Sequence, residues 1–541
     1  MVHIRDIVRL AVGRDGSPGR QPDWMVLDLH GSYPTHASGG ALSMLRREES
    51  FEQFTGRLER LAQLPWLTGV LVRVGDLKAG LATSRALGAA LGRLAKKVRV
   101  VGYVPQVSMR SLLVTAELAE IAAPESAEVQ LPGFGAEQVY LGAFLHKHGV
   151  GFENLRIREY KSALTRFSED HMDAYEREQL TAYLDSAERT WLHTVADGAD
   201  PETVFDAGFT SAAELQDAGL ITKVAYDDEI VTIVDQPLAR SLDVLLPPRS
   251  KSRPGSRSKR RRHLGVAVVP VIGAIVSGRS RPAPPVPLVP GPWAGASTVV
   301  ATLRKADRDE HTAAIVLYVD SSGGSALASD LIGRAVARCR KPVVAVMGEV
   351  AASGGYYVLA QADHVVADPF TLTGSIGVVL GKPVLAQFNA KHGLKPETAG
   401  RELALFNSPN RSFSEAERQW AEKMMAQAYD RFIARVATGR AMTPEQVDRI
   451  GRGRIWSGQD ARGHGLVDEL GGLHEGIAAA RRLAGLGAHA PVRHASLGFS
   501  LPGVPAFGHG TAQGVSGAVE RLWPFGSERV LTWFDQAVRI R

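Results

Sequence analysis

The sequence predicts an α/β protein made of two tandem domains, each with a mostly parallel sheet covered by helices. Short runs rich in Val, Ile and Leu alternate with Ala- and Leu-rich stretches of helical length along most of the 541 residues. The strand-like runs are apolar throughout, which is typical of a parallel sheet buried on both faces. The same order of segments occurs twice, which indicates a duplicated domain.

The duplication becomes visible when the chain is shifted on itself by about 243 residues. "WMVLDLHG" from Trp24 then falls on "AVVPVIG" from Ala267, each a strand that ends in glycine. "LTGVLVRVGDLKAG" from Leu67 falls on "TAAIVLYVDSSGG" from Thr312. "VRVVGYVPQVSMRSLL" falls in the same way on "KPVVAVMGEVAASGGYY". Order and spacing persist over about 200 residues, so we expect two copies of one unit.

The repeat and the composition together predict the domain boundaries. The expected parts are an N-terminal segment 1–21, a first domain 22–235, a basic linker 236–263, a second domain 264–485 and a tail 486–541. The tail ends in "RVLTWFDQAVRIR", whose apolar stripe predicts an amphipathic helix. The stripe consists of Val530, Leu531, Phe534 and Val538. This helix would pack on a neighbouring subunit or lie at a membrane surface, and the sequence leaves both open.

The net charge of +6 comes from one segment of the chain. Residues 249–262, "RSKSRPGSRSKRRR", hold eight basic side chains and no acidic one, so the remainder is close to neutral. A Ser-, Pro- and Arg-rich run is typical of a solvated linker, and contact with anionic lipid headgroups is the sharper alternative. We expect no specific nucleic-acid partner.

Cysteine content and apolar stretches limit the class of protein further. Cys339 is the single cysteine, which excludes an intramolecular disulfide and a cysteine cluster for zinc. The most apolar stretch, "LGVAVVPVIGAIVSG" from Leu264, is shorter than the roughly 20 residues that a membrane span needs. Because Pro270 also interrupts it, we expect a buried pair of strands there. We expect neither a signal peptide nor a transmembrane helix.

Chemistry is expected in the second copy, after two of its strands. Ser353 follows one strand and is followed by Gly354 and Gly355, and "DSSGG" (320–324) follows another. Ligands of such sheets bind beyond the carboxyl ends of the strands, and glycines let the main-chain N–H groups approach them. A hydroxyl nucleophile with two N–H donors for an oxyanion suits acyl transfer. The alternative is that Ser353 only caps a helix.

The two copies differ in a complementary way at two positions. Ser353 in the second copy aligns with Arg110 in the first, whereas Lys161 in the first copy aligns with Ala404 in the second. A serine needs a base, no histidine stands out by its spacing, and a Ser–Lys pair is a known solution. Lys161 would have to be neutral, so we expect burial to lower its pKa. The alternative is that Lys161 is a solvated side chain.

These motifs resemble the long, tandem-domain form of the S49 serine peptidases, the signal peptide peptidase type, over about residues 22–485. The pieces that carry the resemblance are "GEVAASGGYY", "TLTGSIGV", "VDSSGGS" and "REYKSA". It implies a ClpP/crotonase-like fold for both domains. Residue by residue, it implies Ser353 as the nucleophile, Lys161 as the general base and Ser375 as the residue that orients the lysine amine. It also implies an oxyanion hole made by the N–H groups of Gly354 and Gly324.

The same resemblance implies substrates, assembly and location. Family members cut remnant signal peptides and other extended apolar peptides and form bowl-shaped oligomers, tetrameric for the tandem form. We expect this chain to use no cofactor and no metal. In place of the usual Ser-Pro-Gly-Gly, this chain has Ser321-Ser322-Gly323-Gly324, which should loosen the loop. Relatives commonly have an N-terminal transmembrane anchor, which we do not find here. We therefore expect a bacterial protein that is cytoplasmic or peripherally associated with the membrane.

Two other functions remain as alternatives. The chain could be a non-catalytic scaffold that holds partners at a membrane surface through its basic linker and its tail. It could also be a crotonase-type acyl-CoA enzyme, which shares the fold and the oxyanion hole and needs no Ser–Lys pair.

Overall fold

The computed structural model describes the chain in segments. The described residues are 24–35, 49–65, 67–226, 229–230, 263–281, 292–495, 530–533 and 539–540. They form two compact units, one containing residues 1–133 and 188–261 and the other containing residues 134–187 and 262–541. We refer to them as unit 1 and unit 2.

Unit 1 is built on a five-stranded parallel sheet. Its strands, in spatial order, are β1 (Trp24–Gly31), β2 (Gly69–Leu77), β3 (Arg99–Tyr103), β5 (Glu120–Ala123) and β9 (Lys223–Val224). Its helices are α3 (Phe51–Leu61), α4 (Leu81–Ala95), α5 (Met109–Thr115), α9 (Pro201–Phe205) and α10 (Ala212–Asp217). Two short strands, β4 (Gln106–Ser108) and β6 (Glu128–Gln130), pair in parallel beside this sheet. Helix α8 (Ala174–Val195) contains the boundary between the units.

Unit 2 is built on a larger sheet that carries the second copy of the repeat. Its main path, in spatial order, is β19 (Ile455–Ser457), β17 (Leu372–Gly374), β15 (Val343–Ala352), β13 (Thr312–Ser321), β10 (Gly265–Ile272) and β21 (Val492–His494). Strands β16 (His364–Ala367) and β20 (Glu469–Leu470) extend it beside β15. All of these pairs are parallel except β17 with β19. The prediction of an α/β fold with mostly parallel sheets is confirmed.

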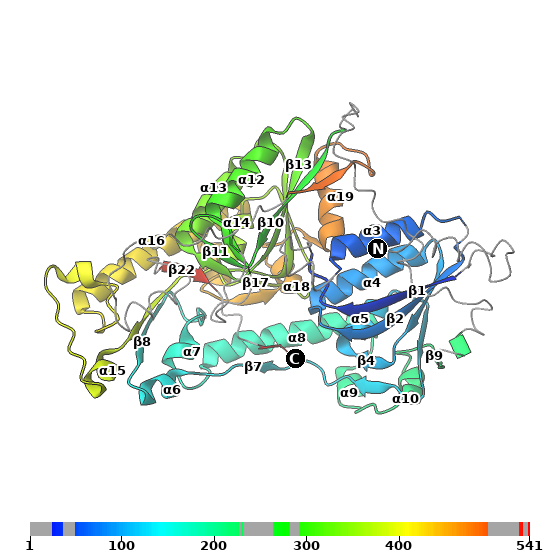
Figure 1. The fold of residues 1–541 in the computed structure, drawn as a ribbon, viewed down its shortest axis with the longest axis horizontal. Coiled ribbons are helices and arrows are strands. Elements are labelled where there is room, and N and C mark those ends of the chain that lie inside the picture. Colours follow the sequence, from blue (N-terminus) through cyan, green and yellow to red (C-terminus); the bar gives the residue numbers. More distant parts are fainter. Residues whose placement is uncertain are drawn as a thin grey trace, which may run out of the picture. The chain divides into compact units, whose positions relative to one another are not determined.

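Helices cover both faces of this sheet because its strands are apolar on both sides. In β13, Ile315 and Leu317 face one apolar cluster, and Val316 faces the other. The first cluster contains side chains of α12 (Ala296–Arg308), α13 (Ala326–Ala337), α14 (Gly354–Leu359) and α16 (Glu415–Gly439). The second contains side chains of α19 (Leu473–Leu483). Figure 1 shows α12 and α13 on one side of β10 and β13, with α19 on the other.

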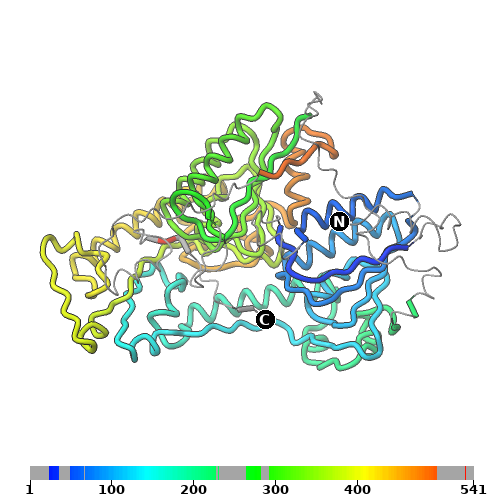
Figure 2. Tube along the Cα trace, viewed as in Figure 1, coloured from blue at the N-terminus to red at the C-terminus, as the bar shows by residue number. Residues whose placement is uncertain are grey.

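A second sheet of unit 2 joins segments that are far apart in the sequence. Its spatial order is β12 (Trp293–Gly295), β11 (Ala274–Val276), β14 (Gly323–Ser325), β22 (Val530–Trp533), β18 (Val379–Val384) and β8 (Gly151–Arg156). Strand β8 pairs antiparallel with β18 along its whole length, and the two run side by side in Figure 2. The buried strand pair expected after Leu264 is confirmed as β10 and β11.

The remaining elements of unit 2 are short. They are β7 (Ala136–Glu137), which pairs with β23 (Arg539–Ile540), together with α6 (Gly142–Lys147), α7 (Thr165–Ser168), α15 (Ala386–Lys391), the 3-10 helix η2 (Glu402–Leu405), α17 (Pro444–Ile450) and α18 (Gly458–Gly463).

The compact units cut across the first of the two domains expected from the repeat. Residues 134–187 fall inside the expected domain 22–235, but by their contacts they belong with the second half of the chain. The physical reason is the pairing of β8 with β18, which attaches this segment to the second sheet of unit 2. Lys161 lies in this segment, so Lys161 and Ser353 are in one compact unit.

The amphipathic helix predicted near residue 530 is wrong where the structure describes it. Val530–Trp533 form strand β22, which pairs antiparallel with β14 on one side and β18 on the other. A strand forms because both neighbours offer an edge for main-chain hydrogen bonds, and Leu531 is fully buried there.

Other expectations fall outside the described residues. The N-terminal segment 1–21, the charged run 249–262 and most of the tail lie there, and so does the linker 236–263 except for its last residue. Within the described ranges, no helix is both long enough and apolar enough to cross a membrane.

Candidate active site

Ser353 stands where strand β15 passes into helix α14, in an uncommon backbone conformation. Its φ is 55° and its ψ is −116°, and few residues other than glycine adopt a positive φ. It occupies the N-cap position of α14, but its side chain makes no capping hydrogen bond. The side chain is fully buried. The alternative that Ser353 is only a helix cap is therefore not supported by its geometry.

The glycines after Ser353 let two loops meet closely. A methyl group on Gly355 would collide with the main-chain carbonyl of Ser321, at the end of β13. Ser321 in turn holds the next loop, since its hydroxyl donates to the Gly273 carbonyl at 2.6 Å and accepts from the Gly323 N–H at 3.1 Å. The loop without the proline is thus fixed by a serine hydroxyl at its first residue.

Lys161 reaches Ser353 from the segment that follows β8. Its Nζ lies 2.7 Å from Ser353 Oγ, although 192 positions separate the two residues in the sequence. The same amine donates to the Ser375 carbonyl at 3.1 Å and lies 2.9 Å from Ser375 Oγ. Lys161 is only 1% exposed. The alternative of a solvated lysine is excluded by this burial.

Burial favours the neutral form of the Lys161 amine. Removing an ammonium group from water is costly, and this desolvation lowers the pKa of Lys161 well below its usual value of 10.5. A neutral amine has two N–H donors and one lone pair. Its donors can serve Ser375, and its lone pair can accept the hydroxyl proton of Ser353.

Ser375 lies at the end of β17 and has a positive φ of 49°. Its N–H donates to the Arg454 carbonyl at 2.7 Å, in the loop before β19. The side chain is 1% exposed. This fixed backbone presents both the carbonyl and the hydroxyl of Ser375 to the lysine amine, which is the placement that the sequence predicted for it.

Gly354 and Gly324, the predicted oxyanion donors, lie on the two loops that meet at Gly355. Gly354 directly follows Ser353 and begins α14. Gly324 is in β14 with a φ of 152°, and a side chain there would collide with the Ile275 carbonyl of β11. The φ of Gly324 is one that residues with a side chain rarely adopt.

A partly buried carboxyl group lies next to this site. Asp320 precedes Ser321, and its Oδ1 accepts from the Val350 N–H at 3.2 Å. Burial, with a smaller contribution from the charge of Glu349, raises the pKa of Asp320 to about 7. Within the described residues, no group of three or more His, Cys, Asp and Glu side chains is placed to hold a metal ion.

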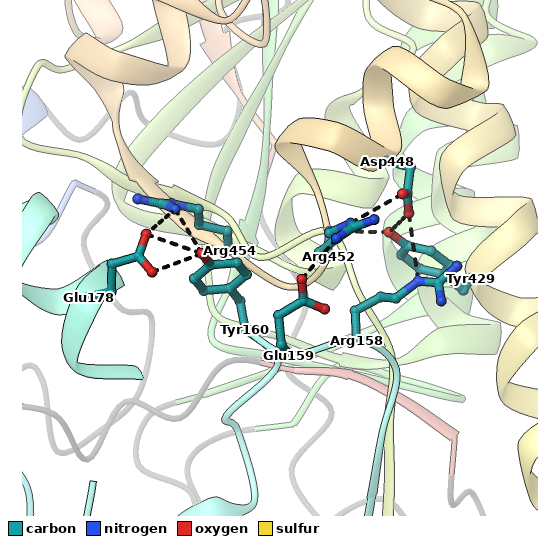
Figure 3. A network of polar contacts seen from close by, with 8 residues as sticks. All are labelled: Arg158, Glu159, Tyr160, Glu178, Tyr429, Asp448, Arg452 and Arg454. Carbon is teal, nitrogen blue, oxygen red and sulfur yellow. Dashed lines mark hydrogen bonds and ion pairs between the residues drawn. The ribbon is translucent and has the colours of Figure 1, made fainter. Parts of the chain in front are cut away.

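A network of charged and aromatic side chains includes the three residues just before Lys161 (Figure 3). Arg452 donates to Glu159 at 2.9 Å. Arg454 donates to Glu178 at 2.6 Å and to the Tyr160 hydroxyl at 3.1 Å. The network thus joins the residues just before Lys161 to the loop of residues 451–454, which precedes β19.

The sequence did not reveal this network. Its residues stand in "REYK" and "GRGR", where Arg and Glu are also typical of solvated loops. The only available signal was the alternation of glycine and arginine immediately before a short apolar strand. Nor did the sequence single out Gln179, which is 1% exposed on α8.

Comparison with known proteins places the chain among peptidases. Residues 93–239 and 335–487 match the profile of "Peptidase family S49", and residues 292–369 match that of "Clp protease". The serine protease SPPA of Arabidopsis thaliana chloroplasts is 30% identical over 90% of this chain and 74% of its own length. Protease 4 of Salmonella typhi is 33% identical over 66% of this chain and 59% of its own.

A further relative, from Enterococcus faecium, is named for signal peptide peptidase SppA and is 35% identical over 31% of this chain. It is covered over 50% of its length, so the chain spans less than two thirds of both this relative and the Salmonella protein. A solved ClpP1 mutant of Listeria monocytogenes also matches, with 16% identity over 39% of this chain and a TM-score of 0.25, and adds nothing to the assignment.

The family match covers both copies of the repeat and more than half of the chain, and the Arabidopsis relative matches nearly all of it. The chain therefore belongs to peptidase family S49 and is a serine peptidase.

Proposed function

We propose that this peptidase uses Ser353 and Lys161 as a catalytic pair to cleave extended apolar peptides, remnant signal peptides among them, through an acyl-enzyme. One observation carries the proposal: the Nζ of a buried lysine lies 2.7 Å from the Oγ of a buried serine. The lowered pKa of Lys161 supports it, because a base must be neutral at the pH of the reaction.

In the first step, the lone pair of Lys161 Nζ takes the proton from Ser353 Oγ. The oxygen attacks the carbonyl carbon of the peptide bond and forms a tetrahedral intermediate. The N–H groups of Gly354 and Gly324 would stabilise its oxyanion, and each such donor typically contributes about 3 kcal/mol. Protonated Lys161 then gives its proton to the leaving amine, which departs and leaves the acyl group on Ser353.

In the second step, water enters in place of the amine. Lys161 takes a proton from this water, which attacks the acyl carbon and forms a second tetrahedral intermediate. When that intermediate collapses, Ser353 Oγ leaves, regains its proton from Lys161, and the carboxylic acid product is released. Ser375 would keep the amine directed at Ser353 throughout, through its carbonyl and hydroxyl.

The extended form of the substrate is supported by strand β22. Gly324, the proposed oxyanion donor, is in β14, and β14 pairs on one edge with β11 and on the other with β22. The place beside Gly324 therefore accepts a peptide segment in extended conformation. Leu531 of this segment is buried among Ala163, Leu164, Val276 and Val379, which supports an apolar preference.

A serine-reactive phosphonate tests the catalytic pair. We expect the wild-type protein to be labelled at Ser353, Ser353→Ala to take no label, and Lys161→Ala to react far more slowly. Full peptidase activity in both variants would refute the mechanism. Turnover of an acyl-CoA by the wild type, without peptide hydrolysis, would favour the crotonase-type alternative, and no turnover of either substrate would favour the scaffold.

We further propose that the protein is a homotetramer, from its resemblance to the tandem form of the family. Light scattering on the purified protein would measure the mass directly.

We propose that residues 249–262 bind anionic membranes from the cytoplasmic side, because their eight basic side chains attract anionic headgroups. Sedimentation with vesicles of anionic and of neutral lipid would test this.

A further inference from the structure

Both neighbours of Lys161 in the chain are held by one buried side chain, that of Gln179. Its Nε2 donates to the Tyr160 carbonyl at 3.1 Å and lies 3.3 Å from Ser162 Oγ. Its Oε1 accepts from the N–H of Ile455 at 3.1 Å. Gln179 is 1% exposed, so these groups take the place of water around the amide.

The orientation of the Gln179 amide follows from its partners. The main-chain carbonyl of Tyr160 can only accept a hydrogen bond, and the main-chain N–H of Ile455 can only donate one. If the amide rotated by half a turn, its oxygen would face the Tyr160 carbonyl and its NH₂ group would face the Ile455 N–H, so both hydrogen bonds would be lost. One amide thus ties the backbone on both sides of Lys161 to the first residue of β19.

Gly453 holds Lys161 from the opposite direction. A methyl group at Gly453 would lie 2.6 Å from both the Cβ and the main-chain nitrogen of Lys161, closer than van der Waals contact permits. Its φ of 85° also disfavours a side chain. Gly377 lies beside Gly453, and a methyl group on it would lie 3.2 Å from Lys161 Cδ.

We propose that Gln179 and Gly453 are positioning residues for the peptidase reaction. They hold the main chain at Lys161 so that its amine reaches Ser353, and neither touches the substrate. A lysine side chain has four rotatable bonds, so the place of its amine depends on where its backbone is anchored and what surrounds its stem. The inference rests on the proposed function, because positioning matters only if Lys161 is the base.

The first test is Gln179→Met, which keeps the length of the side chain and removes its hydrogen bonds. We expect kcat per labelled active site to fall about 10- to 100-fold, as displaced catalytic groups do. KM should stay within about twofold, because Gln179 makes no contact with substrate. The rate of phosphonate labelling should fall with kcat. Gln419→Met is the matched control, since Gln419 is an exposed glutamine on helix α16.

The second test uses Gln179→Glu, in which a carboxylate replaces the amide at nearly constant volume. A negative charge near Lys161 favours the ammonium form, so it raises the pKa of the amine. The pH at which activity begins should therefore move upward relative to the wild type. A general loss of stability would lower activity at every pH and would not move the profile. Gly453→Ala adds no charge, so it should lower kcat without moving the pH profile.

The outcomes separate the two proposals. If Ser353→Ala and Lys161→Ala are inactive while Gln179→Met matches Gln419→Met in kcat and in labelling rate, the positioning role is refuted and the mechanism stands. A wild-type kcat together with an unchanged pH profile in Gln179→Glu would also refute the positioning role. If Ser353→Ala and Lys161→Ala keep full activity, the proposed function itself fails.

Discussion

Each copy of the repeat has a serine where a strand turns into a helix, and the two serines differ in what their hydroxyls bind. Ser108 precedes α5 with an extended backbone (φ −137°), and its hydroxyl accepts from the Ser111 N–H at 3.2 Å. The Ser111 hydroxyl accepts from the Ser108 N–H in return, which completes a capping box. Ser353 precedes α14 with a φ of 55°, caps nothing, and faces Lys161.

The comparison teaches how a helix-capping serine differs from the proposed nucleophile at the same kind of junction. A capping serine stabilises a helix end by roughly 1 kcal/mol. Ser353 forgoes that bond and holds a backbone conformation that costs free energy, which is typical of functional sites. The N3 residue of α14 is Tyr356, where α5 has Ser111, and no capping box forms at Ser353.

The largest effect should come from removing each hydroxyl in turn. We expect Ser353→Ala to lower kcat by at least about 10⁴-fold, because the nucleophile is lost. Ser108→Ala should leave kcat unchanged and lower the free energy of unfolding by about 1 kcal/mol, because a cap is lost. Peptide hydrolysis and chemical denaturation measure the two quantities. Comparable losses of activity in both variants would break the distinction.

A smaller loss is expected from Gly324→Ala. The residue has a φ of 152° and lies against the Ile275 carbonyl, so a methyl group should displace β14 and its N–H. We expect kcat to fall about 100-fold, as when one oxyanion donor is removed. The matched control in the first copy is Gly80→Ala, where φ is −70°, a value that alanine adopts without strain. A steady-state assay in which both variants keep wild-type kcat would count against the oxyanion assignment.

Removing residues 530–541 should have a smaller effect than Gly324→Ala, and it should increase activity by lowering KM. Both edges of β14 are paired, one of them with β22, so a peptide that lies beside Gly324 must displace β22. We expect KM for an apolar peptide to fall about threefold or more, because an internal competitor lowers apparent affinity. Leu531→Asp in the full chain should act in the same direction. An unchanged or higher KM in both proteins would show that β22 does not compete.

The smallest effect concerns the contribution of Lys161 to the stability of the folded protein. The aligned residue in the second copy is Ala404. The pKa of Lys161 is lower in the folded protein than its usual 10.5, so the unfolded chain binds the proton more tightly. Folding is therefore penalised below pH 10.5, and the penalty fades as pH rises toward that value. We expect Lys161→Met to raise the melting temperature at pH 7 and to raise it less near pH 10. The opposite trend would mean that the amine is buried in its charged form.

The sequence was sufficient for the features that depend on local pattern. Apolar runs such as the one after Leu264 predicted the strands, and the complementary loss at Ser353 and Lys161 pointed to residues that the fold brings together. The sequence was insufficient where a neighbouring strand determines the secondary structure. Val530–Trp533 suit a helical stripe as well as a strand, and only the edges of β14 and β18 select the strand.

The same limit explains the missed positioning residues and the unit boundary. Gln179 is a polar residue within a helix, and its burial against Tyr160 and Ile455 depends on contacts that span much of the chain. The assignment of residues 134–187 to unit 2 depends on the pairing of β8 with β18, which the repeat does not encode.

The separation of 192 positions between Lys161 and Ser353 has a consequence for the synthesis and the cleavage of the chain. During synthesis the amine emerges from the ribosome long before the hydroxyl, so the proposed catalytic pair cannot form until residue 353 has been made. A cut anywhere in 249–262 divides the pair between two pieces. By the proposed mechanism each piece alone should be inactive, and turnover recovered on mixing would report that the two pieces have reassembled.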